Sequence, residues 1–273
     1  MITVRSALGA TRAGAAGLAT LVAATLALTL GASPAGAVRD HRLVGPAEVL
    51  GGLPLAGRVV VIDPGHQLGN HNFPAQINQL VPAGGFEKPC DTTGTATNGG
   101  FPEATLNWRV ALLVRERLRT LGATVVLTRS SNREDRWGPC VDVRGRLGNK
   151  VHADLKIGIH GDGSYAPGAH GFDVIAPTDR RPWTHDIYRS SRRLAVATRD
   201  ALRGVGVPTA TYVGRDGIDY RSDLATLNLS DVPTVLVELG NMRNPVDARR
   251  MTSVKGRATY ARGLEHAVRR FLG

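Results

Sequence analysis

Two histidines and two glutamates in this sequence are of the types that hold a metal ion and move a proton: His66, Glu103, His160 and Glu238. Two imidazoles and one carboxylate form a three-ligand zinc set in which a fourth coordination position stays open for water. A further carboxylate beside that water could take its proton. The four residues therefore match the requirements of metal-assisted hydrolysis.

Three of these residues lie at or near the ends of apolar stretches that predict buried strands. The stretch 59–66, VVVIDPGH, delivers His66 after a sharp Asp-Pro-Gly break. His160 ends LKIGIH, and Glu238 lies in VPTVLVEL. Glu103 comes just before a predicted amphipathic helix, 104–121. Because open α/β sheets place their sites at the carboxyl ends of strands, we expect the four side chains to converge there.

Each residue also has a simpler explanation, since the spacing matches no compact ligand motif such as H-E-x-x-H. The two histidines could be ordinary loop residues at strand ends. Glu103 could be a first-turn acid that the helix dipole favours. Glu238 is harder to explain in this way, because a carboxylate inside an apolar strand is costly to bury without a partner.

Strands and helices alternate along the rest of the chain. We expect strands at 59–62, 124–128, 155–160, 171–176 and 232–239, and helices at 104–121, 141–153, 186–203 and 258–271. This alternation predicts an α/β fold, a single domain with a twisted, mostly parallel sheet flanked by helices. The insertion 67–102 is rich in Gly, Asn, Thr and Pro without a clear period, and such segments are usually functional or mobile.

The first 37 residues have the features of a signal peptide. Arg5 and Arg12 precede an uncharged stretch, 13–31, and Ala35-Gly36-Ala37 supplies an A-x-A cleavage site. The alternative is a membrane anchor, because the uncharged stretch approaches spanning length. We expect cleavage, a mature domain of residues 38–273, no stable membrane span after it, and secretion into the cell-wall space.

The formal net charge is +11, and removal of the two leader arginines leaves 11 − 2 = +9. A basic exported protein could meet nucleic acid, anionic lipid or anionic wall polymer. Export makes nucleic acid the least suitable partner, and the basic residues are scattered with few aromatic residues between them. The simplest interpretation of the charge is a solvated face.

The two cysteines, Cys90 and Cys140, allow one intramolecular pair. Export favours oxidation, so we expect a disulfide that ties the insertion to the domain body. The alternative is two buried free thiols.

Four ordered motifs resemble those of the zinc-dependent N-acetylmuramoyl-L-alanine amidases of the amidase-3 type. They are VVVIDPGH, Glu103 ahead of LNWRVALLVRERLRTLGATVVLTR, KIGIHGD, and VPTVLVELGNMRNP. The resemblance runs from about Arg58 to the C-terminus and implies that His66, Glu103 and His160 hold zinc and that Glu238 is catalytic. DPGHQLG and IHGD depart from the usual DPGHGG and IHAN but leave every ligand in place. The insertion with its cysteine is similar to an actinobacterial branch that has no separate wall-binding domain.

The resemblance implies hydrolysis of the amide between the lactoyl group of N-acetylmuramic acid and L-alanine of the stem peptide. The expected partners are peptidoglycan or muropeptide fragments, with soluble fragments cut better than polymer, and the expected state is a monomer. One alternative is another zinc hydrolase that cuts within the stem peptide. A second is a non-catalytic wall-binding module, although such a module has no need of the glutamate base.

Overall fold

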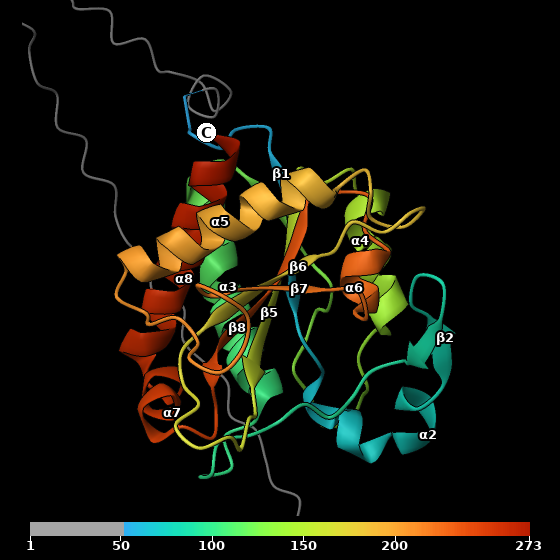
Figure 1. The fold of residues 1–273 in the computed structure, drawn as a ribbon, viewed down its shortest axis with the longest axis vertical. Coiled ribbons are helices and arrows are strands. Elements are labelled where there is room, and N and C mark those ends of the chain that lie inside the picture. The colour runs from blue at the N-terminus through green and yellow to red at the C-terminus, as the bar shows by residue number, and fades with distance from the viewer. Residues whose placement is uncertain (1–51) are drawn as a thin grey trace, which may run out of the picture. The chain divides into compact units, whose positions relative to one another are not determined.

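The computed structural model describes residues 52–273, which form a mixed α/β fold around a central sheet (Figure 1). The sheet has six strands in the order β4-β1-β5-β8-β6-β7. The strands are β1 (Val59–Pro64), β4 (Thr124–Leu127), β5 (Leu155–Asp162), β6 (Asp173–Pro177), β7 (Ile218–Arg221) and β8 (Thr234–Asn241). Only the β6–β8 pair in this sheet is antiparallel. The predicted mostly parallel α/β architecture is confirmed.

Helices cover both faces of the sheet (Figure 1). One face carries α3 (Glu103–Thr120), α5 (Tyr188–Gly204) and α8 (Val254–Leu272), while the other carries α4 (Val141–Lys150) and the short α6 (Ala225–Asn228). The larger core lies under the first layer. There Leu106, Val110, Val114 and Leu118 of α3 recur at helical spacing and pack on the sheet residues Val60 and Ile62.

Strand β7, the short α6 and helix α7 (Pro245–Thr252) are absent from the prediction, and helix α8 begins earlier than predicted, because their sequence signals are local rather than periodic. The edge strand β7, IDYR, has no apolar run to identify it. Helix α7 has Pro245 in its first turn, and the side chain of Asn244 caps the N–H groups of Val246 and Asp247. Helix α8 begins at Val254, earlier than predicted, because Ser253 caps its first turn.

The predicted signal peptide, 1–37, lies outside the described residues. Among residues 52–273, no helix has both the length and the apolar character needed to cross a membrane.

The insertion 67–102 holds short structural elements rather than one irregular loop. It contains a 3₁₀ helix (Leu68–Asn72), α2 (Pro74–Ile77) and a hairpin of β2 (Leu80–Pro82) with β3 (Glu87–Pro89). Directly after β3, a disulfide joins Cys90 to Cys140 at the start of α4, as the sequence predicts. The insertion is thereby covalently fixed to the body of the domain.

Removal of this disulfide is expected to destabilise the domain. The bridge spans 50 residues, and loop-closure entropy for such a length corresponds to about 3–4 kcal/mol of unfolding free energy. We expect the double variant Cys90→Ser/Cys140→Ser to lose stability of this order in urea unfolding without reductant. Equal unfolding midpoints and slopes for the variant and the parent protein would contradict this expectation.

Candidate active site

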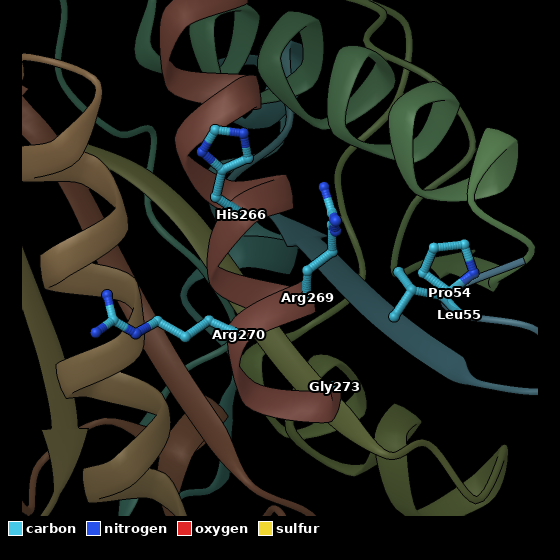
Figure 2. A pocket seen from close by; sticks show the side chains of 6 residues that line it. All are labelled: Pro54, Leu55, His266, Arg269, Arg270 and Gly273. Carbon is cyan, nitrogen blue, oxygen red and sulfur yellow. The ribbon is translucent and has the colours of Figure 1, made fainter.

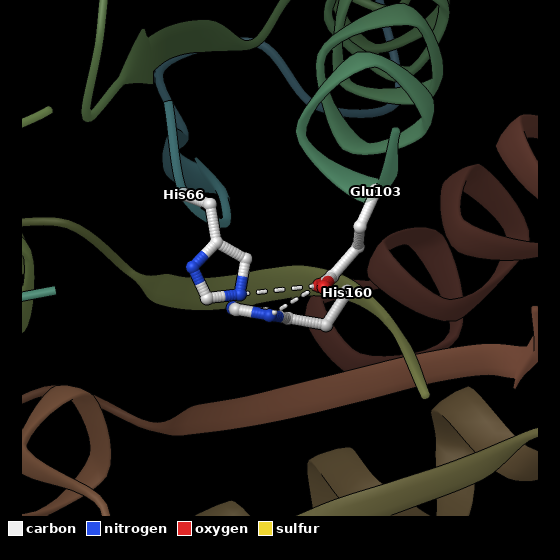
Figure 3. A group of neighbouring side chains, drawn as sticks. All are labelled: His66, Glu103 and His160. Carbon is white, nitrogen blue, oxygen red and sulfur yellow. Dashed lines mark hydrogen bonds and ion pairs between the residues drawn. The ribbon is translucent and has the colours of Figure 1, made fainter. Parts of the chain in front are cut away.

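Three of the four candidate residues form a cluster at the carboxyl edge of the sheet (Figure 3). Oε1 of Glu103 lies 3.3 Å from Nε2 of His66 and 3.0 Å from Nδ1 of His160. The ligand atoms of the three residues all lie within 4.8 Å of one another. The strand ends and the start of α3 thus bring together the three side chains that sequence analysis selected as metal ligands.

The turn after β1 sets the position of the two histidines. His66 has a left-handed backbone conformation, with φ of 57°. A Cβ atom on Gly65 would lie 2.1 Å from the ring of His160, so only glycine lets that ring lie against the turn. Asn107 of α3 donates to the carbonyl of Gly65 and to Glu103, each at 3.2 Å, and so fixes the helix against the turn.

A carboxylate from the insertion orients His66. Nδ1 of His66 lies 2.9 Å from Oδ1 of Asp91. A histidine that donates its Nδ1–H to a carboxylate keeps Nε2 free for a metal. Metal-binding histidines usually make such a hydrogen bond with the ring nitrogen that does not bind the metal. Burial alone would raise the pKa of Asp91, but His66 and Arg144 outweigh it and lower that pKa to about 2. Asp91 is therefore an ionised acceptor at neutral pH.

Arg144 of α4 connects this carboxylate to the strand end. Its Nη1 lies 2.8 Å from Oδ1 of Asp63 and its Nη2 3.3 Å from Oδ2 of Asp91. The same guanidinium also donates to the carbonyls of Pro64 and His66. Arg144, Asp63 and Asp91 are all buried, so the pairing holds the His66 turn in one conformation. Sequence analysis missed it, because no sequence spacing relates Arg144 to the turn.

The donor chemistry of the cluster fits zinc. Two imidazoles and one carboxylate leave a fourth tetrahedral position open. Burial alone would raise the pKa of Glu103, but His66 and His160 outweigh it and hold that pKa well below its usual range. The second oxygen of Glu103 accepts from the N–H of Thr95 at 2.9 Å, which leaves Oε1 toward the histidines.

Glu238 lies beside the cluster rather than within it. It is the register partner of His160 on the neighbouring strand β8. With His66 and His160 it lines a cavity of about 230 Å³. Burial raises the pKa of Glu238 well above its usual range, and the carboxylates of Glu103 and Asp173 add to the rise. Its Oε2 atom has no hydrogen-bond partner in the described part of the chain. A carboxylate with these properties suits proton transfer.

Asp173 is a site residue that sequence analysis missed. It is the register partner of Glu238 on β6 and is only 1% exposed. Neither of its carboxylate oxygens has a hydrogen-bond partner among residues 52–273. Burial raises the pKa of Asp173 to about 7, and the carboxylates of Asp162 and Asp219 add to the rise. The available signal was the one used for Glu238, an acid inside the apolar run FDVIA.

Arg129 has a structural role near the site and does not line the cavity that contains His66 and His160. Its guanidinium donates to the carbonyls of Pro64, Ala104 and Ser131 at 2.9, 2.8 and 2.6 Å. It thereby connects the end of β1, the first turn of α3 and the loop after β4.

A second hollow lies at the C-terminal end of α8, beside the residues that lead into the amino end of β1 (Figure 2). Arg269 and Arg270 border it, but they pair with Glu265 at 3.5 Å and with Asp200 at 3.7 Å. The only other titratable side chain that lines it is His266. Its lining therefore does not supply the groups of a hydrolytic site.

Together the fold and the site define an α/β protein with a candidate metal centre at the carboxyl edge of a mostly parallel sheet. Residues 60–270 match the family model described as N-acetylmuramoyl-L-alanine amidase, and the chain belongs to this family, Amidase_3. The resemblance to the amidase-3 family found in the sequence is thus confirmed.

Known proteins of this kind are similar over most of the described chain. N-acetylmuramoyl-L-alanine amidase Rv3717 of Mycobacterium tuberculosis is 42% identical over 221 residues, which cover 80% of this chain and 88% of that protein. The crystal structure of the amidase Ami1 from Mycobacterium smegmatis superposes with a TM-score of 0.74 at 39% identity, covering 80% and 98% of the two chains. The crystal structure of Ami1 from Mycobacterium abscessus, solved in its apo form, superposes with a TM-score of 0.74 at 42% identity. The match covers 80% of this chain and 100% of that chain.

The chain is therefore a peptidoglycan hydrolase with N-acetylmuramoyl-L-alanine amidase activity. This membership favours an enzyme over the alternative of a non-catalytic wall-binding module.

Proposed function

We propose that the chain hydrolyses the amide between the lactoyl group of N-acetylmuramic acid and L-alanine with the help of zinc held by His66, Glu103 and His160. One observation carries this proposal: three zinc-type donors lie within 4.8 Å of one another, and the register neighbour of one of them is Glu238, whose Oε2 has no hydrogen-bond partner among residues 52–273. Zinc supplies a Lewis acid that eases the ionisation of water and polarises a carbonyl oxygen.

The remaining chemistry falls to Glu238. It accepts a proton from the attacking water, whose oxygen forms a bond to the lactoyl carbonyl carbon. The carbon–nitrogen bond then breaks, and Glu238 returns the proton to the leaving amine nitrogen of L-alanine. The raised pKa of Glu238 makes the carboxylate a stronger base, which supports this role. Asp91 contributes by holding His66 in the orientation that presents Nε2.

Metal removal tests this proposal. Chelation is expected to abolish turnover of a defined muropeptide, and added zinc is expected to restore it with saturation near one equivalent per chain. Full turnover by protein shown to be metal-free would contradict the proposal. Thermal unfolding of the metal-free protein, followed in parallel, separates loss of chemistry from loss of fold.

We further propose that residues 1–37 direct secretion and that residues 38–273 act as a monomer in the cell-wall space. The charged start, the uncharged stretch and the A-x-A site support secretion. A peptidoglycan substrate is consistent with that location. N-terminal sequencing of the secreted protein is expected to begin at Val38.

A further inference from the structure

The metal cluster lies in one of two hollows along the sheet. The cavity that contains His66, His160 and Glu238 extends toward β6 and β7, where Ile175 and Arg221 line it. A wider cleft of about 470 Å³ lies at the opposite edge, beyond β4. Its lining includes Gln67, Thr128, Ser130, Ser131, Arg136 and Trp137. Its lining residue Gln67 directly follows the metal-cluster residue His66 in the chain.

The β7 side offers groups that suit a peptide. Leu236 and Ile175 give the cavity an apolar wall, and Lys88 and Arg221 bring positive charge to it. Both cations already contact Asp223. Nζ of Lys88 donates to its carbonyl at 2.8 Å, while Arg221 donates to its carboxylate at 2.8 and 2.6 Å. An apolar wall with cations at its end fits alkyl side chains and carboxylates, which peptides carry and uncharged sugars lack.

The β4 side offers groups that suit sugars. Trp137 is 37% exposed, although a large aromatic side chain on a soluble protein is usually covered. An indole presents a flat apolar surface to the C–H groups of a pyranose ring. The hydroxyls of Ser130 and Ser131 and the exposed guanidinium of Arg136 can pair with sugar hydroxyl and acetamido groups.

The walls of this cleft are fixed before any ligand arrives. Arg129 donates to the carbonyl of Ser131 at 2.6 Å, and the N–H of Gly138 donates to Asn70 at 3.0 Å. The disulfide at Cys140 holds the far end of the same loop. A preorganised cleft loses little conformational freedom when it binds.

We propose that the Trp137 cleft binds the glycan chain of the substrate, meaning the sugars beyond the N-acetylmuramic acid that carries the scissile bond. The stem peptide then extends the opposite way, over β6 and β7. This inference rests on the proposed function, because it takes the metal cluster as the place where the amide is cut. It makes the enzyme sensitive to glycan length through a surface separate from the catalytic groups.

Kinetics on two substrates test the proposal. One substrate is a muramyl peptide with a single sugar, and the other carries the same peptide on a tetrasaccharide. For Trp137→Ala we expect the ratio of KM values, tetrasaccharide over single sugar, to rise roughly 3- to 10-fold, with kcat on the tetrasaccharide preserved. Trp137→Phe is expected to keep the ratio of KM values close to that of the parent protein. An unchanged ratio for Trp137→Ala would overturn the proposal.

A matched control and a binding measurement sharpen the test. Leu113, on the exposed side of α3, is 38% exposed and lines neither hollow. Leu113→Ala should leave the KM ratio unchanged. Calorimetry is expected to show that a peptide-free tetrasaccharide binds the Glu238→Gln protein. The double variant Glu238→Gln/Trp137→Ala is expected to bind the same tetrasaccharide at least 3-fold more weakly. Equal binding by the two proteins would overturn the glycan assignment. Because this measurement needs no turnover, it distinguishes failure of the glycan cleft from failure of the proposed zinc chemistry.

Discussion

Replacement of His66 or His160 by alanine is expected to remove both bound zinc and amidase turnover. Each histidine supplies one of only three protein donors in the cluster. With one donor gone, the two that remain do not make up the three-ligand set of a catalytic zinc site. We expect less than 0.1 zinc per chain and turnover at the background of the assay, on the order of a 10³-fold loss or more.

His71→Ala is a suitable control for this experiment. His71 lies in the same insertion as Asp91, but its side chain is 54% exposed and contacts the carbonyl of Leu68 at 3.0 Å and the surface residue Glu134 at 3.3 Å. The His71→Ala variant should retain zinc and turnover. Metal content and activity are to be measured on the same samples, with circular dichroism to establish that each variant is folded. Stoichiometric zinc in both His66→Ala and His160→Ala would defeat the ligand assignment.

The second large effect is expected for Glu238→Gln. The substitution keeps the size of the side chain and its ability to form hydrogen bonds, but it removes the basic oxygen. Because Glu238 lies beside the ligand cluster and not in it, zinc content and fold should survive. Turnover should fall by roughly 10²- to 10⁴-fold, the usual contribution of a positioned acid–base group.

Glu116→Gln, on the exposed side of α3, is the matched control and should behave like the parent protein. A Glu238→Gln protein that loses its zinc would make Glu238 a ligand. One that keeps near-native turnover would end the proposed mechanism.

The parts of the fold that the sequence predicts are those with regular apolar patterns. The strands β1 and β8 are continuous apolar runs because both faces of a parallel sheet are covered. Helix α3 shows a clear 3.6-residue period and was predicted nearly to its bounds. The edge strand β7 has alternating polar residues and one neighbour in the sheet, so little in its composition separates it from a loop.

Three of the four candidate residues could be selected from the sequence because a histidine or glutamate at or near the end of an apolar strand is conspicuous, and Glu103 was selected as an acid at the start of a helix. Their contacts with other residues could not be predicted. Asp173 meets Glu238 because β6 pairs with β8, and this strand order cannot be read from the spacing of residues. Asp91 reaches His66 because the path of the insertion and its disulfide bring it back over β1. Such contacts depend on tertiary structure, so local patterns carry no signal for them.

The position of the cut bond gives the most direct test of the proposed reaction. A defined muropeptide is to be hydrolysed in water labelled with ¹⁸O, by the zinc-loaded protein and by the same protein after chelation, and the products analysed by mass spectrometry. We predict that only the zinc-loaded protein acts, that one ¹⁸O enters the lactoyl carboxyl group of the sugar fragment, and that the peptide is released with a free L-alanine amine. Label in a carboxyl group of the stem peptide, or an equal yield after chelation, would contradict the proposed reaction.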